Sequence, residues 1–378
     1  MRVTHLVHSL RGGGAERIAL ELACGMLDRG YQTSVVTLLD TRDYFGGRYM
    51  RVPVRHLMSA TRYDWPWCIS VLGRALRAAV EDWPTDVIEV HTPTAAIVAA
   101  FAGIRVPCVQ VFHGYAEGWR PGTLKHRLLR ALQRYALDRF ESRAIALSED
   151  MAAEISRNLN CARQAIRVVP NGVDLDSFPF RCDSAIVPPV ICVIGTLSAH
   201  KRPADALQAF AKLRSVRRDA RLRFLGDGAL RGDLQRCAAG LGVAAAVDFS
   251  GWRADLAGLL HKTALVWHLS ASEGLPLACL EAMSTGVPVI GTNVRGIRDV
   301  IVDGVTGWLV PLGDCGAVVE RSLELLDDPG LYRSFAEAGR RRVETQFSAT
   351  IMIERHIDAL RGAYERRWQA AGAFAAAT

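Results

Sequence analysis

The chain has 378 residues, of which 50% are hydrophobic and 22% are charged. These proportions are ordinary for globular proteins and exclude a disordered or collagen-like chain, while the length predicts two domains. The longest apolar run, residues 95–104, is far shorter than the roughly 20 residues of a membrane-spanning helix, and no apolar secretory signal opens the sequence. We therefore expect a cytoplasmic protein.

The net charge of +7 is spread over both halves of the chain instead of forming a basic arm. Such even, mild basicity favours an anionic small ligand or an anionic membrane surface over a nucleic-acid partner, which requires clustered basic residues. The nine cysteines include no CxxC pair, so the sequence predicts neither a disulfide framework nor a zinc site.

Short β-rich apolar runs alternate with helical patterns along the first half of the chain. In one helical stretch, Ile18, Leu22 and Met26 lie four residues apart on one face, and Gly30 ends the pattern. This alternation is typical of right-handed βαβ units that build a parallel sheet. The strands are expected at 3–8, 33–39, 86–91, 107–112, 143–147 and 166–169.

The same alternation begins again after Pro188 and Pro189. Five more strands are expected, at 190–195, 221–226, 247–251, 264–270 and 287–292. Two such series predict an α/β protein with two facing Rossmann-like sheets, in which loops at the carboxyl ends of the strands line a cleft. The predicted domains are 1–183 and 184–345, and a final helix within 346–378 is expected to cross back onto the first domain.

The first candidate site is the glycine-rich loop at residues 11–16, between the first strand and the first helix. Glycines allow the backbone to approach an anion, and a helix N-terminus offers free N–H groups to it. The spacing does not match the dinucleotide fingerprint GxGxxG. A tight strand-to-helix turn that simply needs glycine is the alternative interpretation.

The second candidate site is the segment 272–292, which follows the strand at 264–270. Pro276 suits a helix start, so Glu273 is expected in the loop before the helix and Glu281 about one turn into it. Both carboxylates can then face one ligand, and the free N–H groups of residues 274–277 suit a diphosphate. An isolated pair of glutamates is more often solvated surface.

The segment EGLPLACLEAMSTGVPVI, residues 273–290, resembles the donor-binding signature of the retaining GT-B glycosyltransferases of the large group 1 family. The resemblance extends over nearly the whole chain and implies the GT-B fold, with a first domain on the acceptor side and a second domain that binds a nucleotide sugar. The stretches that follow the family pattern in order are GGGAER, FHG at 112–114, ALSEDMAAEI, VVPNGVDLDSF, IGTLSAHKRP, FLGDGAL and VDFSGWRADLAGLL.

The resemblance implies a role for individual residues. Gly13 and Gly14 would lie against the donor phosphates, and Lys201 would pair with the diphosphate. Glu281 would accept hydrogen bonds from the ribose hydroxyls, and Glu273 would hold the hydroxyls of the sugar ring. The other donor-site positions that it implies are Gly195, Thr196, Gly274, Leu275, Pro276 and Leu277.

His113, at the end of the strand at 107–112, resembles the family's histidine near the reacting centre. The resemblance implies that His113, Glu273 and Lys201 are the catalytic candidates. Structural alternatives remain open for each of these side chains. Lys201 can be a surface lysine, Glu281 a partly exposed helix carboxylate, Glu273 a member of a loop ion pair, and His113 a structural residue.

Thr196 is a departure from the family, because many relatives carry an arginine there that joins the lysine in holding the diphosphate. Arg295 and Arg298 occur instead in a loop after the strand at 287–292. We hypothesise that one of them supplies the missing positive charge. The alternative is that both are solvated residues at a helix start.

Asp174 and Asp176 form a D-x-D pattern, which holds a divalent metal in another glycosyltransferase fold. Here the two aspartates lie in the interdomain sequence NGVDLDSF, where turn and helix-cap hydrogen bonds explain them. We therefore expect no metal site and no cofactor other than the nucleotide-sugar substrate.

The stretch 119–143 contains seven basic residues against two acidic ones, together with leucines at helical spacing. A basic amphipathic helix of this kind can lie on an anionic membrane surface. The alternative is an ordinary surface helix whose leucines pack on the sheet. The first interpretation predicts a peripheral protein at the inner face of a membrane.

These features together predict a retaining, metal-independent glycosyltransferase that moves a sugar from a UDP- or GDP-linked donor to a glycan or lipid-linked acceptor. Cell-surface polysaccharide, lipopolysaccharide or glycolipid synthesis is the expected context. Two other functions compete with it: a nucleotide-sugar epimerase on a similar scaffold, and a non-catalytic GT-B binding module.

Overall fold

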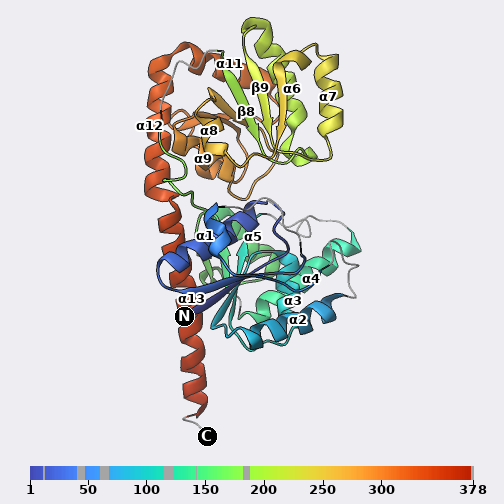
Figure 1. Cartoon of the computed structure of the whole chain (residues 1–378), viewed down its shortest axis with the longest axis vertical. Helices are drawn as coiled ribbons and strands as arrows, with labels where there is room; N and C mark the ends of the chain where they lie inside the picture. The colour runs from blue at the N-terminus through green and yellow to red at the C-terminus, as the bar shows by residue number, and fades with distance from the viewer. Residues whose placement is uncertain are drawn as a thin grey trace. The chain divides into compact units, whose positions relative to one another are not determined.

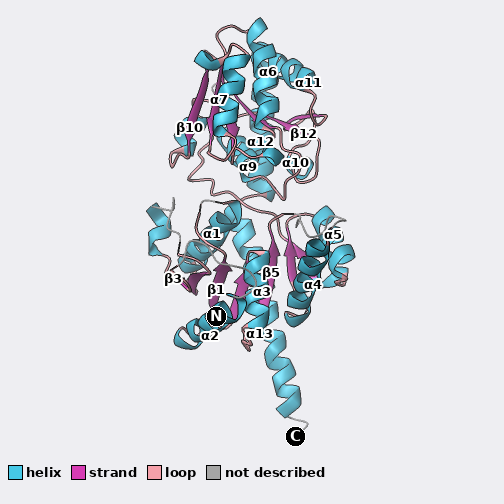
Figure 2. Ribbon diagram, turned by 90° about the vertical axis from the view of Figure 1, so that its right-hand side faces the viewer, coloured by secondary structure: helices cyan, strands magenta, loops and turns pink. Residues whose placement is uncertain are grey.

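The computed structural model describes residues 1–11, 13–40, 47–59, 68–114, 123–141, 143–181 and 188–375, with side chains up to residue 366. The chain divides into two compact units (Figures 1 and 2). The first contains residues up to Asn171 and the chain from Ala349 onward, and the second runs from Gly172 to Ser348. Each unit is built on one parallel sheet covered by helices.

The first unit holds a seven-stranded sheet in the order β3-β2-β1-β4-β5-β6-β7. Every strand predicted for this half is confirmed within one or two residues, whereas β3 was not predicted. This strand has three residues at the sheet edge and pairs only with β2, so its sequence carries no apolar run. The strands are β1 (Arg2–Val7), β2 (Gln32–Thr37), β3 (Val54–His56), β4 (Val87–Val90), β5 (Cys108–Phe112), β6 (Ala144–Ala146) and β7 (Ile166–Val168).

Helices cover both faces of the first sheet. Leu6, Ile88 and Val90 pack on one face against side chains of α2, α3 and α4, and the opposite face carries α1 and α13. The final helix therefore belongs to the first unit, as predicted, and contacts α1, β4 and β5. The helices of the unit are α1 (Gly14–Asp28), α2 (Cys68–Asp82), α3 (Pro93–Phe101), α4 (Leu124–Arg139), α5 (Glu149–Leu159) and α13 (Ala349–Ala375).

The second unit holds a six-stranded sheet in the order β10-β9-β8-β11-β12-β13. Its five predicted strands are confirmed, and β13 is a further edge strand that pairs with β12. The strands are β8 (Val190–Ile194), β9 (Arg221–Leu225), β10 (Val247–Gly251), β11 (Leu265–His268), β12 (Val289–Thr292) and β13 (Gly307–Val310). The helices are α6 (Pro203–Val216), α7 (Arg231–Gly240), α8 (Leu256–Leu260), α9 (Leu277–Thr285), α10 (Ile297–Val300), α11 (Cys315–Asp327) and α12 (Pro329–Gln346).

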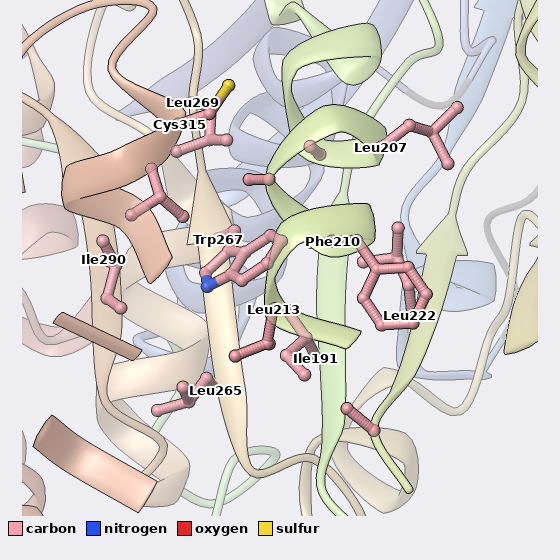
Figure 3. Close-up of a cluster of buried hydrophobic side chains, with 14 of the residues drawn as sticks. Ile191, Leu207, Phe210, Leu213, Leu222, Leu265, Trp267, Leu269, Ile290 and Cys315 are labelled. Atoms are coloured by element: carbon pink, nitrogen blue, oxygen red, sulfur yellow. The ribbon is translucent and has the colours of Figure 1, made fainter. Parts of the chain in front are cut away.

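A fully buried tryptophan on β11 anchors the centre of the second sheet. Trp267 lies among Phe210 and Leu213 of α6 and Ile191 of β8 (Figure 3), and its indole N–H donates to the Ser322 hydroxyl at 3.0 Å. Adjacent residues of a strand point to opposite faces. The packing of Trp267 therefore fixes the direction of His268, the last residue of β11.

The chain enters the second unit earlier than predicted. The expected boundary at 183/184 falls within 182–187, outside the described residues, and the compact units divide between Asn171 and Gly172. Backbone bonds explain the division, because Val173 N donates to Phe347 O at 2.8 Å and Arg181 N donates to Thr285 O at 3.0 Å. Residues 173–181 are therefore fastened to the second unit.

None of the described helices combines the length and the hydrophobicity that a bilayer crossing requires.

Candidate active site

The predicted site residues occur in both units, and each set is described within its own unit. Gly13, Gly14 and His113 belong to the first unit. The remaining predicted residues, from Gly195 to Arg298, belong to the second unit. In each unit, polar side chains gather at the carboxyl ends of central strands, where parallel sheets place their ligand sites.

Three side chains of the second unit form a compact polar cluster. Lys201 ends a short 3₁₀ turn after β8, His268 ends β11, and Glu273 lies in the loop that follows. Lys201 Nζ donates to Glu273 Oε1 at 2.5 Å, and His268 Nε2 lies 2.9 Å from the same oxygen. A pocket beside this cluster is lined by Gly195, Thr196, Lys201, His268 and Ser270, among other residues.

Glu273 is an ionised carboxylate in this environment. Burial by itself raises the pKa of Glu273, but the neighbouring His268 and Lys201 outweigh that effect and hold the pKa well below its ordinary value. The side chain is only 11% exposed, so the alternative of a solvated surface glutamate is wrong, and a loop ion pair does exist. Its oxygens are hydrogen-bond acceptors across the ordinary pH range.

Two glycines allow the backbone to form this site. Gly195, directly after β8, has φ +134°, which residues with a side chain rarely adopt, and it precedes the turn that carries Lys201. Gly296 has φ +81°, and a Cβ there would collide with the backbone of Glu273 and Gly274. The loop before α10 therefore packs directly on the loop that carries Glu273, and Glu273 N donates to Arg295 O at 3.4 Å.

Helix α9 begins at the predicted position. Pro276 is its N-cap, Leu277 its first residue, and Gly274 and Leu275 are buried just before it. Glu281 is 2% exposed, so a partly exposed helix carboxylate is the wrong description of it. A buried carboxylate requires polar partners.

Thr196, Arg295 and Arg298 are exposed. Arg298 lies in α10, whereas Arg295 lies in the loop whose backbone meets Glu273. Of the two arginines, Arg295 is therefore the one whose backbone carbonyl is hydrogen-bonded to the Glu273 loop.

The glycine loop of the first unit holds a carboxylate of its own. Gly13 is the N-cap of α1, and the Glu16 carboxylate folds back against it, so that a side chain on Gly13 would collide with it. Burial raises the pKa of Glu16. Gly13 and Gly14 themselves are exposed, and Gly12 lies outside the described residues.

His113 belongs to a buried group of polar residues that the sequence analysis did not single out. His91 Nδ1 lies 3.0 Å from His113 Nε2, and Glu89 lies two residues before His91 on β4. His5 of β1 and His356 of α13 approach the Glu89 carboxylate at 3.0 and 2.6 Å. A signal for this group existed in DVIEVH, where two polar residues alternate with apolar ones at the end of a strand.

Three atoms of this group, from His5, Glu89 and His91, lie close enough together to surround a metal ion. Glu89 is the one carboxylate in that set, so a divalent cation would leave net positive charge in a site that is fully buried, which is costly. At the D-x-D pattern, the Asp174 carboxylate accepts from Ser177 Oγ at 2.5 Å and from Asp176 N at 3.3 Å. These are the expected turn hydrogen bonds.

Two parallel-sheet domains with a final helix on the first one define the GT-B architecture, and the comparisons agree with that class. Two family models match the chain in succession: Glycosyltransferase Family 4 over residues 12–177 and Glycosyl transferases group 1 over residues 183–342. The chain belongs to these glycosyltransferases.

Curated relatives are similar over parts of the chain. N-acetyl-alpha-D-glucosaminyl L-malate synthase of Bacillus anthracis is 35% identical over 167 residues, which are 44% of either chain. The match therefore spans less than half the length of that relative. Glycogen synthase of Mycobacterium tuberculosis is 27% identical over 293 residues, which are 74% of this chain and 70% of the relative.

Solved structures share the fold over almost the whole chain. The crystal structure of Anabaena HepE with UDP and glucose has a TM-score of 0.81 at 20% identity. The match covers 96% of this chain and 99% of the HepE chain. Sucrose-phosphate synthase of Thermosynechococcus elongatus has a TM-score of 0.82 at 17% identity. The match covers 98% of this chain and 100% of the synthase chain. These likenesses confirm the GT-B fold.

Replacing Gly296 by alanine should destabilise the second unit. A left-handed backbone conformation strained by a side chain costs on the order of 1–3 kcal/mol, and the new Cβ also collides with the Glu273 loop. A denaturation midpoint measures the effect. Gly232→Ala is the control, because Gly232 lies in α7, where a Cβ would make only an ordinary contact with the Arg236 side chain. Equal midpoints for the two variants would contradict the assigned role of Gly296.

Proposed function

We infer that this glycosyltransferase takes its sugar from a nucleoside diphosphate donor and transfers it with retention of configuration and without a metal ion. The observation that carries this proposal is the cluster of Lys201, Glu273 and His268 beside a pocket at the carboxyl ends of β8 and β11. A cation and an ionised carboxylate side by side suit the two parts of such a donor, its phosphates and its sugar hydroxyls.

In this proposal, donor binding separates Lys201 from Glu273. Lys201 moves to the diphosphate, and Glu273 accepts hydrogen bonds from the sugar hydroxyls. Glu281 accepts hydrogen bonds from the ribose, and the N–H groups at the start of α9, near Gly274 to Leu277, face the phosphates. The backbone of Gly195 and Thr196 lies beside them. Gly13 and Gly14 approach the donor phosphates, which requires the Glu16 carboxylate to move away from Gly13.

The transfer step breaks the bond between the anomeric carbon and the diphosphate oxygen. The acceptor hydroxyl oxygen forms its bond to the same face of the carbon, and its proton goes to the departing phosphate. Negative charge grows on the diphosphate as the bond breaks, so Lys201 and the α9 N-terminus stabilise the transition state. His113 remains the catalytic candidate of the first unit in this proposal.

UDP is the first donor nucleotide to test, since HepE is crystallised with UDP and with UDP-glucose. GDP is the second donor nucleotide to test. The acceptor in this proposal is a glycan or a lipid-linked sugar of a cell-surface polysaccharide or glycolipid. Release of nucleoside diphosphate that requires added acceptor is the test of transfer. A changed sugar without release identifies an epimerase, and binding without either identifies a binding module.

Glu281→Ala should weaken nucleotide-sugar binding while the fold remains intact, because it removes acceptors for the ribose. Glu273→Ala should lower turnover more than nucleotide affinity, because its partner is the sugar. Isothermal titration and the diphosphate-release assay measure the two effects. Glu320→Ala, at an exposed position of α11, is the control. Unchanged affinity in the Glu281 variant, or equal losses in both properties for the Glu273 variant, would reject these roles.

Arg295 or Arg298 should supply the charge that Thr196 lacks. A charge-assisted hydrogen bond contributes about 1.5–3 kcal/mol, so its loss should weaken diphosphate binding at least tenfold. Arg295→Ala, Arg298→Ala and Lys201→Ala are compared by titration with nucleoside diphosphate, and the monophosphate is the internal control. Changes below twofold in both arginine variants would leave Lys201 and the backbone N–H groups as the phosphate ligands.

We also propose that α4 holds the protein at an anionic membrane surface. Leu124 is 82% exposed and Leu128 is 55% exposed, so these two leucines do not pack on the sheet. The buried side of α4 is formed by Gln133, Ala136 and Leu137. Residues 119–122 and 142 of the basic stretch lie outside the described residues.

Wild type should co-sediment with anionic vesicles more than with neutral ones at low salt. Each basic residue near an anionic surface contributes about 1 kcal/mol, so replacing Arg127, Arg130 and Arg134 together by glutamine should abolish the difference. A charge-matched control replaces three exposed arginines of the second unit, Arg218, Arg236 and Arg333. If wild type ignores anionic vesicles, the membrane role is rejected and a soluble acceptor is favoured.

A further inference from the structure

His268 links the core of the second sheet to the polar cluster at its carboxyl end. Trp267, the residue before it, packs into the core against α6, so His268 points to the opposite face of β11 (Figure 3). Its backbone pairs with Gly291 of β12, and its side chain is only 3% exposed. The sheet therefore fixes the ring, whose Nε2 atom lies 2.9 Å from Glu273 Oε1.

The loop that carries Glu273 is held along its backbone. The carbonyl oxygen of Ser270 accepts from Thr292 Oγ1 at 2.6 Å. One residue further on, Ala271 N donates at 2.8 Å to His200 O, in the 3₁₀ turn that ends in the lysine of the cluster. The two loops are thus joined to each other through their main chains. We therefore expect a bound ligand to rearrange side chains here and not the backbone.

Two donors share one oxygen of the Glu273 carboxylate. Lys201 Nζ donates to Oε1 at 2.5 Å, and His268 Nε2 faces the same atom. Nε2 carries a proton there whether the ring is neutral or cationic, because a lone pair would be repelled by the ionised carboxylate. No hydrogen bond between described residues reaches Oε2. This second oxygen is the one that a ligand can take.

The two donors differ in their freedom to leave the carboxylate. Lys201 has a flexible four-carbon side chain and is 23% exposed, whereas the His268 ring is fixed on a central strand. A buried carboxylate that loses all its donors is costly. When Lys201 goes to the diphosphate, His268 is the donor that remains on Oε1.

We propose that His268 is a positioning residue, which holds Glu273 by Oε1 while Lys201 moves to the donor diphosphate, so that Oε2 faces the hydroxyls of the donor sugar. This role rests on the proposed function, in which Lys201 and Glu273 contact the two parts of the donor. All three residues belong to the second unit. His268 acts through Glu273 and makes no contact of its own with the donor.

Folding stability tests the shared support in the full-length protein without substrate. His268→Leu and Lys201→Ala each leave Glu273 with one donor, and the double variant leaves it with none. The double variant should therefore lower the denaturation midpoint by more than the sum of the two single shifts. Adding Glu273→Ala should remove this excess, because no carboxylate then needs a partner. Additive shifts would overturn the proposal.

Titration with UDP and with UDP-glucose tests the role in donor binding. His268→Leu should weaken UDP binding about tenfold or more, the effect of one charge-assisted hydrogen bond, because the departure of Lys201 then leaves the carboxylate without a donor. UDP-glucose should lose less affinity, since its sugar hydroxyls donate to Glu273. An equal or larger loss with UDP-glucose would identify His268 as a direct sugar ligand and overturn the proposal.

Two amide variants separate reach from polarity. His268→Gln places an amide nitrogen near the position of Nε2 and should recover UDP affinity and the denaturation midpoint. His268→Asn carries the same amide on a shorter side chain, near the position of Nδ1, and should behave like His268→Leu. Equal behaviour of the two amide variants would contradict a role that depends on the contact with Oε1.

Glu273→Ala provides the matched background for the affinity measurement. In this variant Lys201 has no partner to leave and His268 has no carboxylate to hold. Adding His268→Leu should then change UDP affinity by less than about twofold, as independent substitutions do. A further loss of the size seen in wild type would show that His268 contacts the donor itself, and would overturn the proposal.

The His268 role and the proposed function can fail separately. Diphosphate release on addition of acceptor, together with additive stability shifts, would reject the His268 role and leave the function. Excess destabilisation in the double variant, without binding of a UDP- or GDP-linked sugar by wild type, would reject the function and the movement of Lys201. The shared support of Glu273 by His268 and Lys201 would then stand alone.

Discussion

A polar side chain on a central strand of these sheets has little access to water, because helices cover both faces and only the carboxyl ends of the strands stay open. A carboxylate in such a position is stable only when donors or cations satisfy its oxygens. Glu89 on β4 is such a case at 0% side-chain exposure, and Glu273, in the loop that follows β11, is nearly as buried at 11%. The polar architecture of each unit is arranged around one of them.

The two carboxylates have different kinds of partner. Glu89 is held by histidines that are themselves fixed on β1 and α13, and no water reaches them. Glu273 is held by His268 from a rigid strand and by Lys201, which has a long side chain and is 23% exposed. The first arrangement suits a permanent support, and the second suits a site whose cation can change partners.

Much of this fold is predictable from local sequence because a strand buried on both faces is a short apolar run with clear limits. The edge strand β3 is an exception, because its sequence VRH carries no apolar run. The edge strand β13, GWLV, carries a short apolar run but was not predicted. The loop carrying Glu273 and the start of α9 were predictable from Pro276 and the flanking glycines. The partners of the carboxylates were not, because His5 and Glu89 meet only through the lateral register of β1 and β4. The sequence likewise predicts His268 only as part of a strand, although it indicates its partner Glu273 as a site residue.

The first unit is assembled from two separate stretches of chain, whereas the second unit is continuous from Gly172 to Ser348. Domains commonly complete their folding in the order in which the ribosome makes them. Here that order is reversed at the end, because His356, which satisfies Glu89, is synthesised after every residue of the second unit. Until α13 is synthesised, β4 and β5 lack its cover and Glu89 Oε1 lacks the His356 donor. The first unit can therefore complete its packing only after the whole second unit has been synthesised.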